Sequence, residues 1–136
     1  MPVAGYFVVD ERLNPLAEEP VTAANDLRTA RTVAELDLDT AYGTLTHAAV
    51  SGSRGDSAWL VAPDGSRTTL WQGLDWGYVQ VFTTDEFPRE GVLGRAVAVE
   101  PMTAPPDALN SGQGLSWIEP GATWEGSWGV RYTPAS

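Results

Sequence analysis

A lone glutamate ends an apolar, alternating stretch of the sequence. In GRAVAVEPMTAPPDALNSG, residues 94–112, the valines of AVAVE fall on one face of a strand, and the alanines and Glu100 fall on the other. Pro101 has no N–H to donate to a neighbouring strand, so we expect the strand to end there. A carboxylate above small alanines has room for a ligand and can act as a general base. The alternative is a solvated side chain at a strand end.

The sequence contains one histidine and no cysteine, and these counts exclude most familiar catalytic sets. Without a second imidazole or any thiolate, His47 cannot build a typical metal site, and we find no convincing Ser–His–Asp set around it. His47 alternates with Leu45 and Ala49, so we expect a structural position on a sheet face. We therefore predict neither a metal nor an organic cofactor.

Two further motifs each have an ordinary structural explanation beside a functional one. The tripeptide RGD at 54–56 matches an adhesion motif, but SGSRGDS also has the composition of a hairpin connection, which we favour. Tryptophan can bind sugars, because the flat face of a pyranose stacks on an indole ring. Trp117, Trp124 and Trp128 are candidates for such a role, and packing against other residues explains them equally well.

Short β-type runs separated by Gly and Pro dominate the chain. The clearest signal is SAWLVAPDGSRTTLW, residues 57–71, in which Pro63-Asp64-Gly65 predicts a hairpin turn. Pro120-Gly121 predicts another turn between strands, and only residues 20–37 hint weakly at a helix. Further strand-like runs span residues 4–10, 36–50, 77–85, 94–100 and 115–132. The pattern predicts a single all-β domain over residues 1–136, with the architecture of a β-sandwich or barrel.

The charge balance limits the kinds of partner. Eight basic and eighteen acidic residues give a net charge of −10, which repels phosphate backbones and anionic lipid surfaces. We therefore expect neither nucleic acid nor a membrane as a partner. The first residues lack the basic flank of a signal peptide, and no apolar run has transmembrane length, so we expect a cytoplasmic protein.

Several segments, taken in order, resemble one protein family. VAVEPMTAPPDALNSGQGL followed by PGATWEGSWGV resembles the closing segment of the aldose 1-epimerases, or galactose mutarotases. VTAANDLR, LDTAY and YVQVFTTD resemble upstream segments of the same family and are weak signals individually. The resemblance covers nearly the whole chain and corresponds to the C-terminal half of an epimerase. It implies a galactose mutarotase-like supersandwich, present here as a partial domain.

The resemblance also implies roles for three residues. Glu100 would be the general base that removes the proton from the C1 hydroxyl of a hexose such as galactose or glucose. Asp39 would bind sugar hydroxyls, and Gln80 would bind another hydroxyl or hold the glutamate in place. The alternative is that Gln80 is an ordinary residue on a sheet face. The substrate would be an unphosphorylated hexose, because the acidic balance and the loop after Glu100 suit a sugar phosphate less well.

The sequence departs from this family in its general acid. The family protonates the ring oxygen with a histidine from the half of the sequence that this chain lacks, and His47 matches no such position. We therefore expect the chain to form a homo-oligomer or to bind a complementary N-terminal half. The alternative functions are a non-catalytic carbohydrate-binding module that uses Glu100, Asp39 and a tryptophan, and a structural half-domain that needs a partner.

Overall fold

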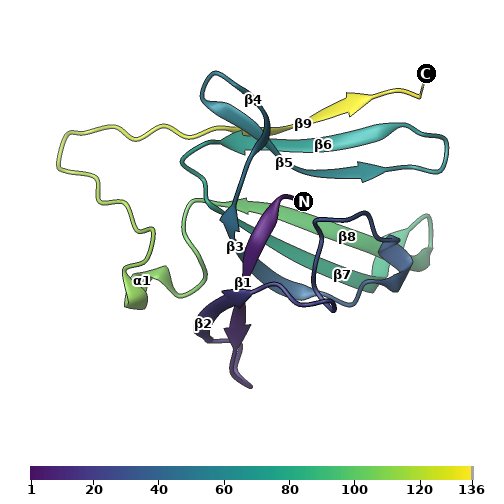
Figure 1. Cartoon of the computed structure of the whole chain (residues 1–136), viewed down its shortest axis with the longest axis horizontal. Coiled ribbons are helices and arrows are strands. Elements are labelled where there is room, and N and C mark those ends of the chain that lie inside the picture. Colours follow the sequence, from purple (N-terminus) through teal and green to yellow (C-terminus); the bar gives the residue numbers. More distant parts are fainter. Residues whose placement is uncertain (136) are drawn as a thin grey trace.

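Two antiparallel sheets make up most of the protein, which confirms the predicted all-β fold (Figure 1). The computed structural model describes residues 1–135. Sheet A has the strand order β2-β1-β3-β7-β8, and sheet B has the order β4-β5-β6-β9. The strands of sheet A are β1 (Val3–Val9), β2 (Pro15–Pro20), β3 (Asp39–Leu45), β7 (Tyr78–Arg89) and β8 (Val92–Met102). Those of sheet B are β4 (Ala48–Ser51), β5 (Arg54–Val61), β6 (Arg67–Gly73) and β9 (Trp128–Thr133).

Sheet A buries one face under its own chain. The main cluster of buried apolar side chains comes from three strands of this sheet and from the connection between β2 and β3, residues 21–38. That connection contributes Leu36 and Leu38, and the short 3-10 helix η1 (Val33–Glu35) lies within it. The cluster consists of Val3, Leu36, Leu38, Tyr42, Val79 and Val81. We call the face that carries Tyr42 and Val79 the inner face, and the opposite one the outer face.

Sheet B is held together by polar contacts as well as by its hydrogen-bond ladder. Gln72 is fully buried; its side chain accepts a hydrogen bond from Ser57 Oγ at 2.9 Å and donates one to the Trp76 carbonyl at 2.7 Å. The pairing of β5 with β6 shifts by one residue at Ser57, so Asp56 and Ala58 lie on opposite faces although they are two residues apart. This bulge determines which side chains of β5 face the apolar side of sheet B.

A long connection joins the two sheets after β8. Residues 103–127 contain only the four-residue helix α1 (Ala108–Ser111) and extend away from the strands in the view of Figure 1. Asp107 at its start has a positive φ of 61°, and Gly112 at its end has a φ of 74°, so the helix is enclosed by two left-handed residues. The connection therefore gives β9 a long tether to the rest of the chain.

The hairpin at residues 62–66 is confirmed, whereas two predicted strand boundaries are wrong. β8 continues through Pro101 to Met102; because β8 is an edge strand, the missing N–H of Pro101 can face the open side. Residues 115–119 form no strand, so the turn at Pro120-Gly121 does not join two strands. The weak helix signal in residues 20–37 corresponds only to η1. Within residues 1–135, no helix is long and apolar enough to span a membrane.

Candidate functional site

Three neighbouring strands of sheet A bring the predicted site residues to the outer face. β7 lies between β3 and β8, and the register pairs Gln80 with Ala41 on one side and with Glu100 on the other. Asp39 lies two residues before Ala41, and alternation along β3 places both on the same face. Asp39, Gln80 and Glu100 therefore share one surface, which we call the polar cluster.

Contacts within the polar cluster fix the position of Gln80. Its Nε2 donates a hydrogen bond of 2.7 Å to Asp39 Oδ1. Glu100 lies directly across the ladder from Gln80, at a position where side chains of an antiparallel pair are about 5 Å apart. The amide of Gln80 is therefore oriented by the Asp39 carboxylate. Asp39 and Glu100 are both exposed.

Aromatic side chains border the polar cluster along β7. Tyr78 and Phe82 lie two residues before and after Gln80, so all three face the same side of the sheet. A strand rises about 3.3 Å per residue, which places the Cα atoms of these two residues about 13 Å apart, with Gln80 between them. Phe82 is 41% exposed, and its ring lies opposite Asp39 in the register. The arrangement presents hydrogen-bonding groups flanked by flat apolar rings.

Residues of β1 and β2 cover the outer face next to β3. The ring centroids of Phe7 and Tyr78 lie 6.1 Å apart. The Glu18 carboxylate lies over Gly5 and Gly43, where a Cβ atom on either glycine would collide with it, and it accepts a hydrogen bond of 2.7 Å from Thr44 Oγ1. A third carboxylate therefore lies on the outer face.

The loop after β8 lies beside the same surface. A Cβ atom on Gly114 would lie 3.1 Å from Tyr78 Cε2 and 3.3 Å from Pro105 Cδ. The proline-rich segment that follows Glu100 in the sequence therefore packs beside Tyr78 and forms a rim at this end of the outer face. Sequence analysis did not identify Tyr78, Phe82 or Glu18 as site residues; alternation along β7 was the available signal for the two rings.

The remaining candidate residues lie elsewhere. His47 lies in the connection between β3 and β4, next to Gly55, and not within a strand as predicted. Both of its ring nitrogens are buried without a hydrogen-bond partner in the described structure. Trp124 stacks on Trp76 with a centroid distance of 6.2 Å, and Trp128 belongs to sheet B. Trp117, in the connection before β9, is 85% exposed.

The RGD tripeptide is part of β5 and not a hairpin connection. Asp56 is only 5% exposed and accepts a hydrogen bond of 2.7 Å from Arg131, which lies on β9. The Arg54 guanidinium lies 4.4 Å from the centroid of the Trp71 ring. Both charged groups of the tripeptide are thus engaged within sheet B, which argues against an adhesion role.

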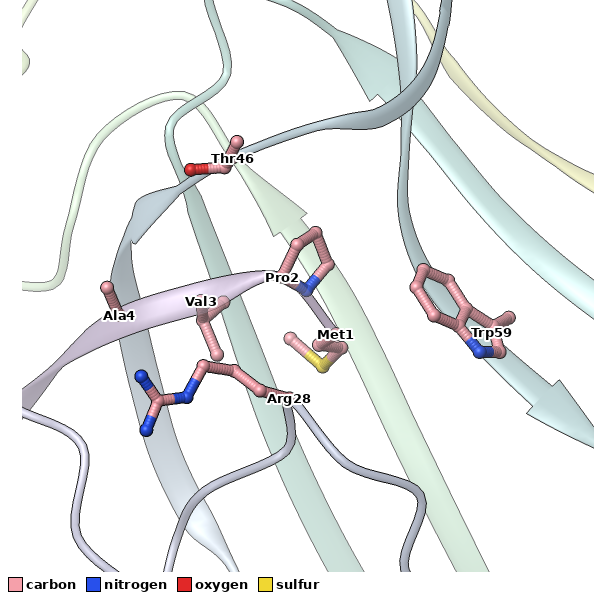
Figure 2. Close-up of a pocket in the computed structure, with 7 residues that line it drawn as sticks. All are labelled: Met1, Pro2, Val3, Ala4, Arg28, Thr46 and Trp59. Atoms are coloured by element: carbon pink, nitrogen blue, oxygen red, sulfur yellow. The ribbon is translucent and has the colours of Figure 1, made fainter.

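An open depression lies where the two sheets approach each other. Figure 2 shows it between the start of β1, with Met1 and Pro2, and the ring of Trp59 on β5. Arg28 and Thr46 also line it, and no carboxylate does. Arg28 is held by Asp26, with an N–O distance of 2.7 Å, so its charge is already neutralised. This depression is separate from the polar cluster.

The described residues contain no group of three or more His, Cys, Asp or Glu side chains that could hold a metal ion. The chemistry available on the outer face is therefore that of carboxylates, an amide and aromatic rings. Comparisons with models of protein families, with curated proteins and with solved structures found no match to this chain.

Proposed function

We propose that the outer face of sheet A binds an unphosphorylated hexose and that Glu100 is the general base of an aldose 1-epimerase-type reaction. The observation that supports this most is the shared surface of Asp39, Gln80 and Glu100, with Gln80 Nε2 bonded to Asp39. The sequence resemblance assigns these three residues to one sugar site, although Asp39 and Glu100 are 61 residues apart along the chain. Carboxylate and amide groups bind sugar hydroxyls, and the rings of Tyr78 and Phe82 suit the apolar face of a pyranose.

The reaction requires one base and one acid. Glu100 takes the proton of the C1 hydroxyl as the C1–O1 bond becomes a carbonyl, and the bond between C1 and the ring oxygen breaks. The ring oxygen must gain a proton in the same process. After rotation about the C1–C2 bond, the ring closes on the other face of the carbonyl, and the two protons return. No atom is gained or lost by the sugar.

No histidine of this chain lies on the outer face to act as the acid. His47 is the only histidine in the sequence, and its ring is enclosed beside β5 and not on the outer face. Without such a histidine, water is the acid that is available to the isolated chain. General acid and general base catalysis each contribute about 10²–10⁴-fold, so we expect the isolated chain to accelerate mutarotation weakly.

Polarimetry on freshly dissolved α-galactose and α-glucose tests the proposal. We expect a rate above that of buffer, lost in Glu100→Gln and retained in Glu86→Gln, which removes an exposed carboxylate from the far end of β7. Calorimetry should show that Glu100→Gln still binds sugar, because the amide keeps a hydrogen-bonding group but cannot accept the proton. Equal rates for the wild type and Glu100→Gln would exclude Glu100 as the base.

A non-catalytic carbohydrate-binding surface is the second candidate. The observation that favours it is the exposure of Asp39 and Glu100 on an open sheet face, where water is not excluded. Here the aromatic partners would be Tyr78 and Phe82, in place of the tryptophan expected from the sequence. In this case calorimetry would detect binding that Phe82→Ala weakens, while no variant would change the rate of mutarotation.

A further inference from the structure

The protein exposes more surface than a compact chain of its mass. Its accessible area is 8881 Å² at a mass of 14.6 kDa. Folded monomers of this mass expose about 6,900 Å², so the excess is roughly 2,000 Å². Each partner in a standard protein interface buries about 800 Å², and partners in obligate dimers bury more. Part of this excess comes from the connection 103–127 and from β9, where most residues are exposed.

Part of the exposed apolar area lies on one face of sheet B. The register of β5, β6 and β9 places their alternate side chains on a surface without a charged residue, which we call the apolar face. Tyr132 is 64% exposed and Trp128 is 54% exposed on this face. Its large apolar members are Leu60, Leu70, Trp128, Val130 and Tyr132. An uncharged surface of this kind is unusual on a chain with a net charge of −10.

β9 is the edge strand least protected against pairing. Among the four edge strands, β2 carries Pro15, Glu18, Glu19 and Pro20, which are typical protections of an edge. β8 carries Glu100 and Pro101, and β4 is only four residues long. β9 has six residues and neither a proline nor a carboxylate, and its one cation, Arg131, is paired with Asp56. Its outer backbone groups can therefore accept another strand.

We propose that β9 forms the interface between two copies of this chain. A two-fold axis near the middle of β9 would pair β9 with β9 of the second copy in antiparallel fashion, and two four-stranded sheets would become one continuous sheet. An isologous contact of this type closes on itself and gives a dimer, not a filament. The neutral apolar face lets two chains of like charge approach there, because repulsion is smallest where neither copy carries a carboxylate.

Light scattering and analytical ultracentrifugation test the association. We expect a dimer of twice 14.6 kDa. Because two copies with a net charge of −10 repel and salt screens this repulsion, we expect the dissociation constant to fall as NaCl is raised. A mass of one chain at submillimolar concentration would overturn the proposal. Association that weakens with salt would also overturn it, because it would indicate an interface of charge pairs.

Matched substitutions locate the interface on β9. Val130 is 61% exposed on β9, and Val50 is 57% exposed on β4, the opposite edge of the same sheet. We expect Val130→Glu to weaken the dimer about 10-fold, because the two-fold axis places two like charges beside each other across the paired strands. Val130→Thr adds no charge and should weaken the dimer less, which separates loss of the apolar contact from added repulsion. Val50→Glu should leave it unchanged, and circular dichroism checks that each variant is folded.

A single cysteine tests the strand pairing directly, since the chain has no cysteine of its own. Opposed residues in antiparallel strands have Cα atoms about 4.5–5.5 Å apart, within the span of a disulfide. Oxidation of Val130→Cys should give a covalent dimer, and oxidation of Val50→Cys should not. Cross-linking of the β4 variant but not of the β9 variant would place the interface at the other edge and overturn the proposal.

Discussion

Sheet A and sheet B differ in how their faces are covered. The inner face of sheet A is buried under the connection 21–38 of the same chain, and Tyr42 on it has no exposed surface. The apolar face of sheet B has no such covering segment over its β9 edge, where Trp128, Val130 and Tyr132 remain more than half exposed. One sheet therefore carries its own core, whereas the other leaves apolar side chains exposed at its β9 edge.

The two sheets therefore contribute differently to stability and to association. Substitutions in the core of sheet A should lower the free energy of unfolding of a single chain. Substitutions of exposed residues on β9 should chiefly change the oligomeric state. Four predictions test this difference, starting with the largest expected effect.

Tyr42→Ala should destabilise the chain by about 3–5 kcal/mol, because it removes a buried aromatic ring and leaves a cavity. It also removes the hydrogen bond of 2.7 Å that the Tyr42 hydroxyl donates to the Asn25 carbonyl. Urea unfolding measures the change, with Tyr132→Ala on β9 as the control. A larger loss for Tyr132→Ala at a concentration where the wild type is monomeric would reverse the comparison.

Tyr42 should also make the protein sensitive to alkaline pH. Burial raises the pKa of Tyr42 from 10.0 to about 12. Between these values the unfolded chain has lost a proton that the folded chain keeps, so stability falls as the pH rises, by about 3 kcal/mol over two pH units. Below pH 10 this contribution is fully present. Denaturant midpoints measured from pH 9 to 12 should show the slope in the wild type and in Tyr132→Phe, but not in Tyr42→Phe.

Gln72→Met should cost about 1–3 kcal/mol, because Ser57 Oγ and the Trp76 carbonyl would lose their buried partner. The same substitution at Gln80, on the outer face of sheet A, should cost much less, because Asp39 is exposed and water can replace the amide. Chemical denaturation of the two variants compares a polar contact inside sheet B with one at the surface of sheet A. Equal losses would mean that Gln80 also supports the fold.

Asp26→Asn should have the smallest effect and show it only through the pH. Hydrogen bonds from the side chain and backbone of Arg28 lower the pKa of Asp26 to about 2. Such a carboxylate stabilises the folded chain above its unfolded pKa of 3.8, and the effect is lost as the pH falls toward 2. Thermal melts between pH 2 and 6 should show a shallower acid dependence in the variant. An unchanged profile would mean that this exposed pair contributes nothing measurable.

Local patterns in the sequence predicted individual strands and turns better than the arrangement of the strands in two sheets. The turn at Pro63-Asp64-Gly65 forms as expected, with Ser66 N–H donating to Asp64 Oδ1 at 2.8 Å and Gly65 at a φ of 88°. Alternation also predicted that Val79 and Val81 face away from Gln80, and the structure buries both valines in the core. The division of the strands between two sheets depends on contacts between distant residues, which a period-2 pattern does not encode.

The position of β8 at an edge explains the error at Pro101. A proline ends a central strand but is tolerated on an open edge, and the sequence alone does not reveal which strands are at the edge. The family resemblance predicted the three residues of the polar cluster. The two aromatic residues beside the cluster could not be predicted, because the sequence does not show that Tyr78 and Phe82 lie on the outer face of β7. The roles of Glu100, Asp39 and Gln80 in sugar chemistry remain predictions.

The long connection 103–127 also determines the order in which sheet B assembles. β9 must find β6 across more than fifty residues of chain, whereas β5 and β6 are joined by a short turn. The entropy of closing the longer loop costs about 2 kcal/mol more than that of the hairpin. We therefore expect β9 to join sheet B last during folding and to detach first, so its amide hydrogens should exchange with solvent before those between β5 and β6. While it is detached, β6 of one chain is open to β9 of another, which is the condition for strand exchange between copies.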